Sequence, residues 1–135
     1  MPTFTLHNNS LEYEPSDVIN FAEGLIGLPG LRRLALVRQP EIDPFLWLAA
    51  LDVDGMAFLV VEPRSLFPDY ELPEYDAQEE LLLALVKLEP EWTATTVNLR
   101  APLIINRANK CGRQTVLTET PYKLDEHLPD TCLAA

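Results

Sequence analysis

The sequence predicts an all-β fold, a small antiparallel β-barrel in a single domain with at most short helical turns. Three observations support this prediction. Short apolar runs recur at intervals of about 8–12 residues, which is typical of barrels and sandwiches. Nearly all of the 12 prolines lie where such a run ends, and the missing N–H of proline costs least there. No stretch combines a long helical period with capping residues at both ends.

The first half of the chain holds five candidate strands. They are TFTLHN, VINF, RRLALVRQ, PFLWLAALD and MAFLVVEP. The glycines of GLIGLPG follow VINF and are expected to give turns with positive φ. Asp54-Gly55 lies between the last two runs and is a strong signal for a hairpin. We therefore expect these two strands to pair in antiparallel fashion.

The second half begins with an ambiguous run, LLLALVKLEP, which suits a helix or a strand by periodicity alone. We expect a strand over 81–88, preceded by YDAQEE (75–80) as a turn or a single helical turn. TATTVNL, PLIIN and RQTVLT are the next strand candidates. YKLDEHL, near the end, stays ambiguous between strand and helix.

Length and composition suit one globular domain of 135 residues, of which 47% are apolar. We expect an ordered core over 1–128 and a flexible tail over 129–135. No apolar run reaches the ~18–20 residues that cross a bilayer, and the N-terminus lacks the pattern of a signal peptide. Cys111 and Cys132 are expected to be free thiols in a reducing compartment. These observations predict a cytoplasmic protein.

Charge is the most pronounced bulk property, with 21 acids against 10 bases and a formal net charge of −11. Affinity for nucleic acid depends on basic residues that neutralise phosphates, so a nucleic acid is not an expected direct partner. A basic protein would be attracted, although an acidic surface can also serve solubility alone. Residues 62–91 hold nine acids and two bases, whereas residues 100–113 hold four bases and no acid. One side of the molecule is therefore expected to be negative.

Catalytic and metal-binding motifs are scarce. The two histidines lie at opposite ends of the chain, and GLIGLPG lacks the strand–helix context of a phosphate site. We therefore expect no enzyme, no metal and no cofactor. Two acid pairs, Asp52/Asp54 and Asp69/Glu71, would each put both carboxylates on one face of a strand. A small acidic β-barrel enzyme or metal-binding protein that uses these four residues remains the alternative, followed by a barrel with a small-molecule pocket.

The stretch AFLVVEPRSLFPDYE (57–71) joins a core strand to a loop that mixes aromatic and acidic residues. Its two prolines end the strand and stiffen the loop by fixing φ. Phe67 is expected to turn back into the core. Aromatic residues within a polar rim are typical of interfaces, so Asp69, Tyr70 and Glu71 are expected to form a docking surface.

Several segments together resemble the family of the flagellar assembly factor FliW. They are FAEGLIGLPGL (21–31), PFLWLAALD (44–52), AFLVVEPRSLFPDYE (57–71), TVNLRAPLIIN (96–106) and the closing YKLDEHL. The resemblance implies a compact β-barrel without enzymatic activity. It also implies two alternative protein partners, the RNA-binding repressor CsrA (carbon storage regulator) and flagellin, with flagellin taking the protein away from CsrA. The free protein is expected to be a monomer that binds no membrane.

Motif match and expected exposure give a set of partner-binding residues. The set is Asp69, Tyr70, Glu71, Glu74, Asn98, Arg100, Asn106 and Arg107. For the two asparagines, hydrogen bonding within turns is an equally good interpretation. The expected core residues are Phe21, Trp47, Phe58 and Val60. The connection 72–80 is shorter than in typical family members, which puts any partner contacts on it in doubt.

Overall fold

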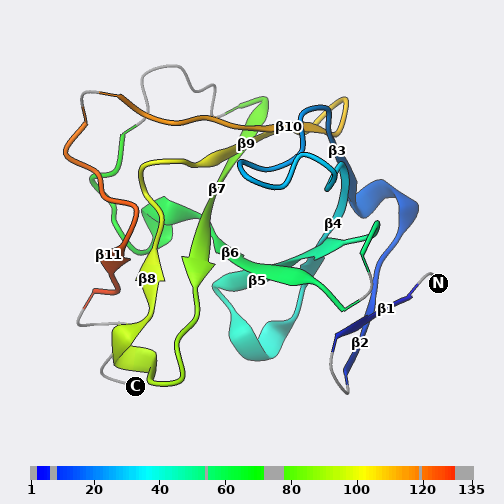
Figure 1. Cartoon of the computed structure of the whole chain (residues 1–135), viewed down its shortest axis with the longest axis horizontal. Coiled ribbons are helices and arrows are strands. Elements are labelled where there is room, and N and C mark those ends of the chain that lie inside the picture. Colours follow the sequence, from blue (N-terminus) through cyan, green and yellow to red (C-terminus); the bar gives the residue numbers. More distant parts are fainter. Residues whose placement is uncertain (1–2, 7–8, 54, 72–77, 119, 130–135) are drawn as a thin grey trace.

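The computed structural model describes residues 3–6, 9–53, 55–71, 78–118 and 120–129, and it confirms the all-β prediction (Figure 1). The strands are β1 (Thr3–Leu6), β2 (Asn9–Glu12), β3 (Val18–Phe21), β4 (Arg33–Arg38), β5 (Phe45–Ala50), β6 (Ala57–Val61), β7 (Glu80–Lys87), β8 (Thr96–Val97), β9 (Leu103–Asn106), β10 (Cys111–Gln114) and β11 (Glu126–His127). Four short 3₁₀ turns are η1 (Pro15–Asp17), η2 (Pro40–Ile42), η3 (Pro63–Ser65) and η4 (Trp92–Ala94). Among the described residues, no helix is long and apolar enough to cross a membrane.

Seven strands close into a barrel in the order β7-β6-β5-β4-β3-β10-β9, with β9 pairing back onto β7 (Figure 1). All of these pairs are antiparallel except β3–β10, which is parallel. The long strand β7 makes closure possible because its two halves have different partners. Its first half pairs with β9, where Leu83 lies opposite Leu103, and its second half pairs with β6, where Leu85 lies opposite Val60. The end of β7 also pairs with β8, outside the barrel.

The barrel interior is filled by one buried cluster with members on β3, β4, β5, β6, β7 and β9. Alternate residues of each strand supply it, as the period of two requires. Phe21 is fully buried in this cluster. On the neighbouring strand, a Cβ added to Gly112 would lie 2.5 Å from Cζ of Phe21. Glycine at this position therefore lets β10 pass directly over the ring.

Two further clusters cover the outer faces of the sheet. One lies over β5, β6, β7 and β9, where Tyr70 and Leu128 cover strand residues such as Val61. The other lies over β4 and β5, where Leu11 from β2 covers Val37. Trp47 packs at the margin of both clusters. The outside of the barrel thus has two apolar covers that meet near Trp47.

Most of the predicted strands are confirmed. The run expected at 81–88 forms β7, shifted by one residue, and the β5–β6 hairpin forms with Gly55 at a φ of 76°. RQTVLT contributes only its start to β10, and the ambiguous YKLDEHL gives the two-residue strand β11. The sequence did not predict β2. Within YDAQEE, residues 75–77 lie outside the described residues, as do 130–135 of the expected tail.

The expected core holds for Phe21 and Val60, which are fully buried. The prediction of full burial is wrong for Trp47 and Phe58, which are only partly buried. Trp47 lies on the outer face of the sheet, where its Nε1 donates a hydrogen bond to Oε1 of Gln39 at 2.8 Å. A buried or half-buried indole needs a hydrogen-bond partner for its N–H, and Gln39 supplies it on the outer face. The periodicity of the sequence does not reveal this partner.

Candidate partner-binding surface

A turn over residues 98–102 interrupts the path from β8 to β9. The side chain of Asn98 builds it, because its Oδ1 accepts hydrogen bonds from the backbone N of Arg100 at 3.1 Å and of Ala101 at 2.9 Å. Asparagine side chains commonly form such hydrogen bonds to nearby backbone groups in turns. The turn exposes Arg100 and buries Leu99.

Tyr70 reaches this turn from the loop after η3. Its Oη donates a 2.7 Å hydrogen bond to the carbonyl of Leu99, and its ring lies 4.5 Å from that of Tyr122, centroid to centroid. The side chain is only 2% exposed. Burial, with a smaller contribution from Tyr122, raises the pKa of Tyr70 to about 12. Arg64 fixes the same loop by donating from Nε to the Tyr70 carbonyl at 2.9 Å.

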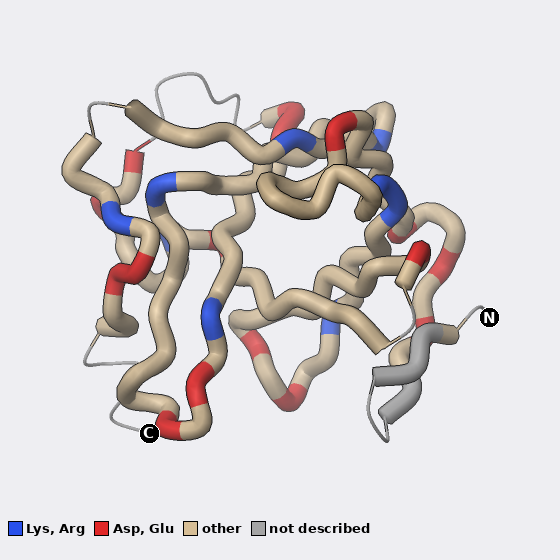
Figure 2. The backbone as a smooth tube through the Cα atoms, in the orientation of Figure 1, with Lys and Arg blue, Asp and Glu red and all other residues tan. Residues whose placement is uncertain are grey.

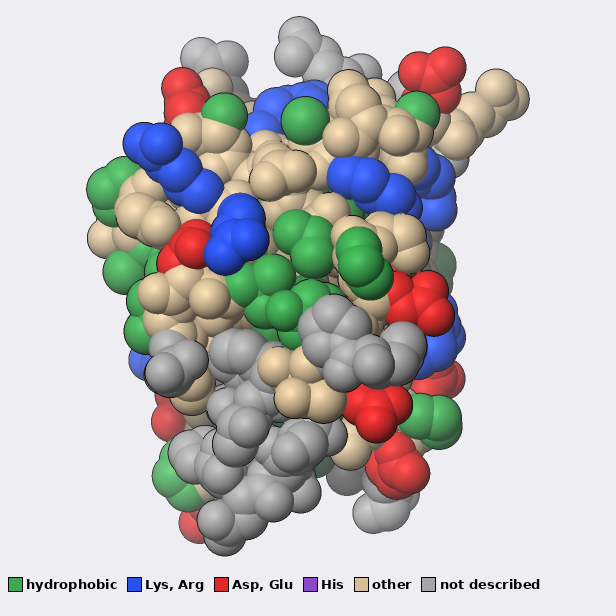
Figure 3. Space-filling view, turned by 90° about the vertical axis from the view of Figure 1, so that its right-hand side faces the viewer, with side chains coloured by type: hydrophobic (Ala, Val, Ile, Leu, Met, Phe, Trp, Pro, Cys, Tyr) green, Lys and Arg blue, Asp and Glu red, His purple; other side chains and the backbone are tan. Residues whose placement is uncertain are grey.

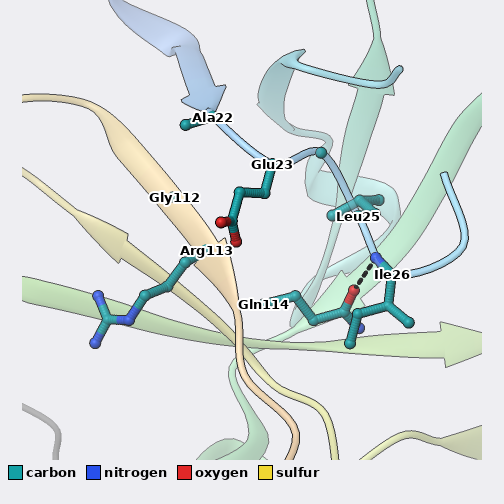
Figure 4. Close-up of a pocket in the computed structure, with 8 residues that line it drawn as sticks. Ala22, Glu23, Leu25, Ile26, Gly112, Arg113 and Gln114 are labelled. Atoms are coloured by element: carbon teal, nitrogen blue, oxygen red, sulfur yellow. Dashed lines mark hydrogen bonds between the residues drawn. The ribbon is translucent and has the colours of Figure 1, made fainter. Parts of the chain in front are cut away.

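Gln114 of β10 reaches the turn from the other side. Its Nε2 donates to the carbonyl of Ala101 at 3.1 Å, and its Oε1 accepts from the backbone N of Ile26 at 2.8 Å (Figure 4). One side chain therefore joins the 98–102 turn to the loop that follows β3. Three segments far apart in sequence are fixed to one another at this point.

The loop after β3 is itself a tight turn, in which Leu25 and Leu28 exchange backbone hydrogen bonds of 3.2 and 2.8 Å. The expected positive φ is confirmed at Gly24, at 66°, and at Gly27, at 82°, and is wrong at Gly30, whose φ is not positive. A Cβ on Gly24 would also lie 2.6 Å from the Leu28 carbonyl oxygen. The loop leaves Ile26 57% exposed at its tip.

A small pocket of about 290 Å³ with both polar and apolar lining lies between this loop and β10 (Figure 4). The Glu23 carboxylate points toward β10, where Arg113 turns outward. Arg113 is already paired, because its guanidinium lies 3.0 Å from Oε2 of Glu80. Figure 3 shows the face that lies on the right in Figure 1, where β3 and β4 lie, with apolar side chains gathered between basic and acidic ones.

The sequence pattern that defines the FliW protein family matches residues 4–128 of this chain. The chain belongs to the FliW family. It is 35% identical over 133 residues to the flagellar assembly factor FliW of Clostridium botulinum strain Alaska E43, covering 91% of this chain and 93% of that relative. Identity to the FliW of Thermoanaerobacter pseudethanolicus is 36% over 126 residues, covering 83% and 82%. A crystal structure of the flagellar assembly factor FliW matches with a TM-score of 0.81 at 28% identity, covering 93% of this chain and 96% of that one.

These findings confirm the predicted FliW resemblance, and the structure explains what its motifs do. Tyr70, Asn98 and Gln114 hold three FliW-like segments together around one turn. In this chain, therefore, much of what makes the sequence recognisable as FliW builds the scaffold. The residues left for partners are those that the scaffold displays.

Tyr70 requires a correction, because it was predicted as an exposed partner contact and is instead buried with its hydroxyl satisfied. Phe67, expected in the core, is partly buried and packs against the same outer cluster. Asp69 and Glu71, on either side of Tyr70, are exposed as predicted. The backbone N of Glu71 donates to Oη of Tyr122 at 2.9 Å, so this tyrosine supports the loop.

The remaining predicted residues fall into two places. Asn98 and Arg100 belong to the 98–102 turn, near Tyr70. Asn106 and Arg107 lie at the far end of β9, where Oδ1 of Asn106 accepts from the backbone N of Ala108 at 3.0 Å. Both asparagine side chains therefore serve turns, which is the alternative interpretation given above. Arg100 and Arg107 are exposed, and Glu74 lies outside the described residues.

Sequence reasoning missed Gln114 and Tyr122. Tyr122 lies in a segment that the resemblance marked, whereas nothing in the pattern around Gln114 distinguishes it from an ordinary strand residue. Both were missed because their partners lie far away in sequence, 88 residues for the Gln114 to Ile26 bond and 51 for Tyr122 to Glu71.

The alternative metal or acid–base site finds no support in the described part of the chain. The Asp52 carboxylate accepts from the backbone N of Arg33 at 3.2 Å and lies 3.4 Å from its Nε. The backbone hydrogen bond from Arg33 is the main reason that the pKa of Asp52 is lowered. No group of three or more His, Cys, Asp or Glu residues in the described ranges could hold a metal ion, and Asp54 lies outside those ranges.

Proposed function

We propose that this FliW-family protein is a non-enzymatic, cytoplasmic regulator of flagellum assembly that binds CsrA and, alternatively, flagellin. The match to the FliW family across residues 4–128 is the observation that carries the proposal. Bound to CsrA, the protein would stop CsrA from repressing flagellin translation. Flagellin that accumulates in the cytoplasm would take the protein away and release CsrA.

Charge gives the proposal a physical mechanism. A repressor that holds RNA must carry basic surface, because phosphate contacts dominate its affinity. A partner with a formal net charge of −11 would be drawn to that surface and would lower the local potential that the phosphates need. The protein could then weaken RNA binding without filling the RNA site.

The rigid mount of Asp69 and Glu71 supports this mechanism. Tyr70 lies between them and is fixed in the core by its hydrogen bond to Leu99, while Tyr122 supports the backbone of Glu71. Two carboxylates held in place lose less conformational entropy on binding than two on a loose loop. Each of these two carboxylates should therefore contribute more to the affinity for CsrA than an ordinary surface acid does.

A charge reversal tests the mechanism. Asp69, Glu71 and Glu79 are exposed and would be changed together to lysine. The matched control changes three exposed acids elsewhere, Glu12, Glu14 and Asp125, to lysine. Fluorescence anisotropy of a labelled leader RNA on CsrA measures how much protein is needed to release the RNA at physiological salt.

We expect the first variant to need at least about tenfold more protein than the control, because the acids nearest the docking loop dominate a field screened over about 8 Å. Docking that persists together with unchanged RNA release would contradict the field mechanism. Failure of the wild-type protein to bind either CsrA or flagellin would contradict the proposed function itself.

A further inference from the structure

An apolar groove of about 420 Å³ lies on the outer face of the barrel, between η2 and the connection from β7 to η4. Phe45, Trp47 and Leu59 form its floor, and Ile42, Leu88 and Trp92 form its walls. None of these residues belongs to the partner-binding set predicted from the sequence.

The floor of the groove is preformed. Trp47 and Leu59 lie directly opposite each other on the paired strands β5 and β6. Nε1 of Trp47 is held by Gln39 at 2.8 Å. The rings of Phe45 and Trp92 meet edge to face, with centroids 5.6 Å apart. A partner would not have to order these side chains, so little of its binding energy would be spent on rearrangement.

Leu88 is the first residue after β7, which ends at Lys87. It lies at the rim of the groove, and 56% of its surface is exposed. A large exposed apolar side chain beside a largely buried aromatic floor is the composition of an interface centre. An isolated exposed leucine needs no explanation, but one that continues an apolar groove does.

The two connections that border the groove both carry acidic residues. Glu41 and Asp43 line the groove, and Glu89 and Glu91 follow Leu88 on the opposite connection (Figure 2). Asp43 pairs with Arg38 and Glu89 with Lys87, each at 3.5 Å. Glu41 and Glu91 are exposed and form no salt bridge to a described residue. The groove therefore combines an apolar centre with a surplus of negative charge.

We infer that this groove docks a basic protein surface that inserts one or two aliphatic or aromatic side chains and places lysine or arginine against Glu41 and Glu91. The inference rests on the proposed function, under which the occupant is CsrA. Charge complementarity selects CsrA over flagellin, because an RNA-binding protein must display basic residues.

A leucine pair in the chain gives a matched test. Leu88 is 56% exposed at the rim and Leu124 is 58% exposed elsewhere. Leu88→Lys puts a positive charge where basic residues of the partner would lie, and Leu124→Lys makes the same change outside the groove. Isothermal titration calorimetry with CsrA should show affinity at least about tenfold weaker for L88K, since like charges brought together in an interface oppose binding. L124K should match the wild type.

The two tryptophans give a second readout, because the chain has only these two and both line the groove. Protein labelled with 5-fluorotryptophan should show two ¹⁹F resonances, and unlabelled CsrA should shift both of them. Resonances that stay in place while calorimetry reports binding would overturn the inference, because binding would then occur elsewhere.

The outcomes separate the groove from the function. If the wild type binds CsrA and L88K binds it with the same affinity, the inference that CsrA docks in the groove is overturned and the proposed function still stands. Loss of flagellin binding alone in L88K would overturn the assignment to CsrA. If the wild type binds neither protein, the proposed function fails and the inference fails with it. Thermal unfolding of both leucine variants, expected at the wild-type midpoint, controls for loss of fold.

Discussion

Replacing Tyr70 by phenylalanine removes one hydroxyl from the centre of the contact that joins the acidic loop to the 98–102 turn. The ring stays, so packing against Tyr122 is kept. The 2.7 Å hydrogen bond to the Leu99 carbonyl is lost, and Leu99 is only 2% exposed. An unsatisfied buried carbonyl costs about 1–3 kcal/mol, so we expect Y70F to lower the free energy of unfolding by about 2 kcal/mol.

Urea unfolding followed by circular dichroism measures this loss, and the melting temperature should fall by about 8 °C, at about 4 °C per kcal/mol for a chain of this size. Tyr122→Phe is the control. Its hydroxyl accepts from the backbone N of Glu71, which is exposed and can bind water instead. Y122F should therefore cost no more than about 0.5 kcal/mol.

Partner affinity completes the test. Because Tyr70 is buried, it cannot contact a partner directly, so folded Y70F should lose only the small part of its CsrA affinity that depends on the rigid mount of Asp69 and Glu71. A variant that keeps its stability but loses affinity would refute the structural role of Tyr70 and restore the partner contact that the sequence predicted. Equal destabilisation by Y70F and Y122F would refute the argument from burial.

Three further predictions follow from named contacts. Gly112→Ala should destabilise by about 1–3 kcal/mol through overpacking, because its Cβ would lie 2.5 Å from the Phe21 ring, while Gly30→Ala, with open space around it, should stay within about 0.5 kcal/mol in the same urea assay. The lowered pKa of Asp52 stabilises the fold above the unfolded value of 3.8 and loses that effect as pH falls through the lower folded pKa. The free energy of unfolding of D52N should therefore fall less than that of the wild type as the pH is lowered through this range. The pKa of Tyr70, raised from 10.0 to about 12, gives stability that is complete below pH 10.0 and lost as pH rises through the folded value, so Y70F should show a shallower alkaline unfolding curve.

Local sequence signals predicted the strands and the barrel class but not which strands pair to close the barrel. β7 and the β5–β6 hairpin follow from short-range patterns, namely an apolar run and a glycine turn. The parallel β3–β10 pair and the return of β9 to β7 join segments far apart in the chain. Periodicity says which residues of a strand face the core and says nothing about which strand lies next to it.

The candidate surface was also predicted only in part, because some of its contacts join residues far apart in the sequence. The exposure of Asp69 and Glu71 was predicted correctly because charge is a property of the residue itself, whereas their role in binding stays a prediction. Tyr70 was misjudged because its burial depends on a carbonyl 29 residues away, and the acids around it suggested a surface. The groove went unnoticed because Trp47 reads as a core residue, and only the paired strands show that it lies on the outside of the barrel.

Competition between the two proposed partners tests the central claim most directly. A purified complex of this protein with CsrA would be titrated with flagellin and followed by size-exclusion chromatography with light scattering. The account predicts that flagellin displaces CsrA, which elutes free and binds leader RNA again, while this protein moves into a complex with flagellin. A stable ternary complex that leaves CsrA unable to bind RNA, or a CsrA complex that flagellin does not change, would contradict it.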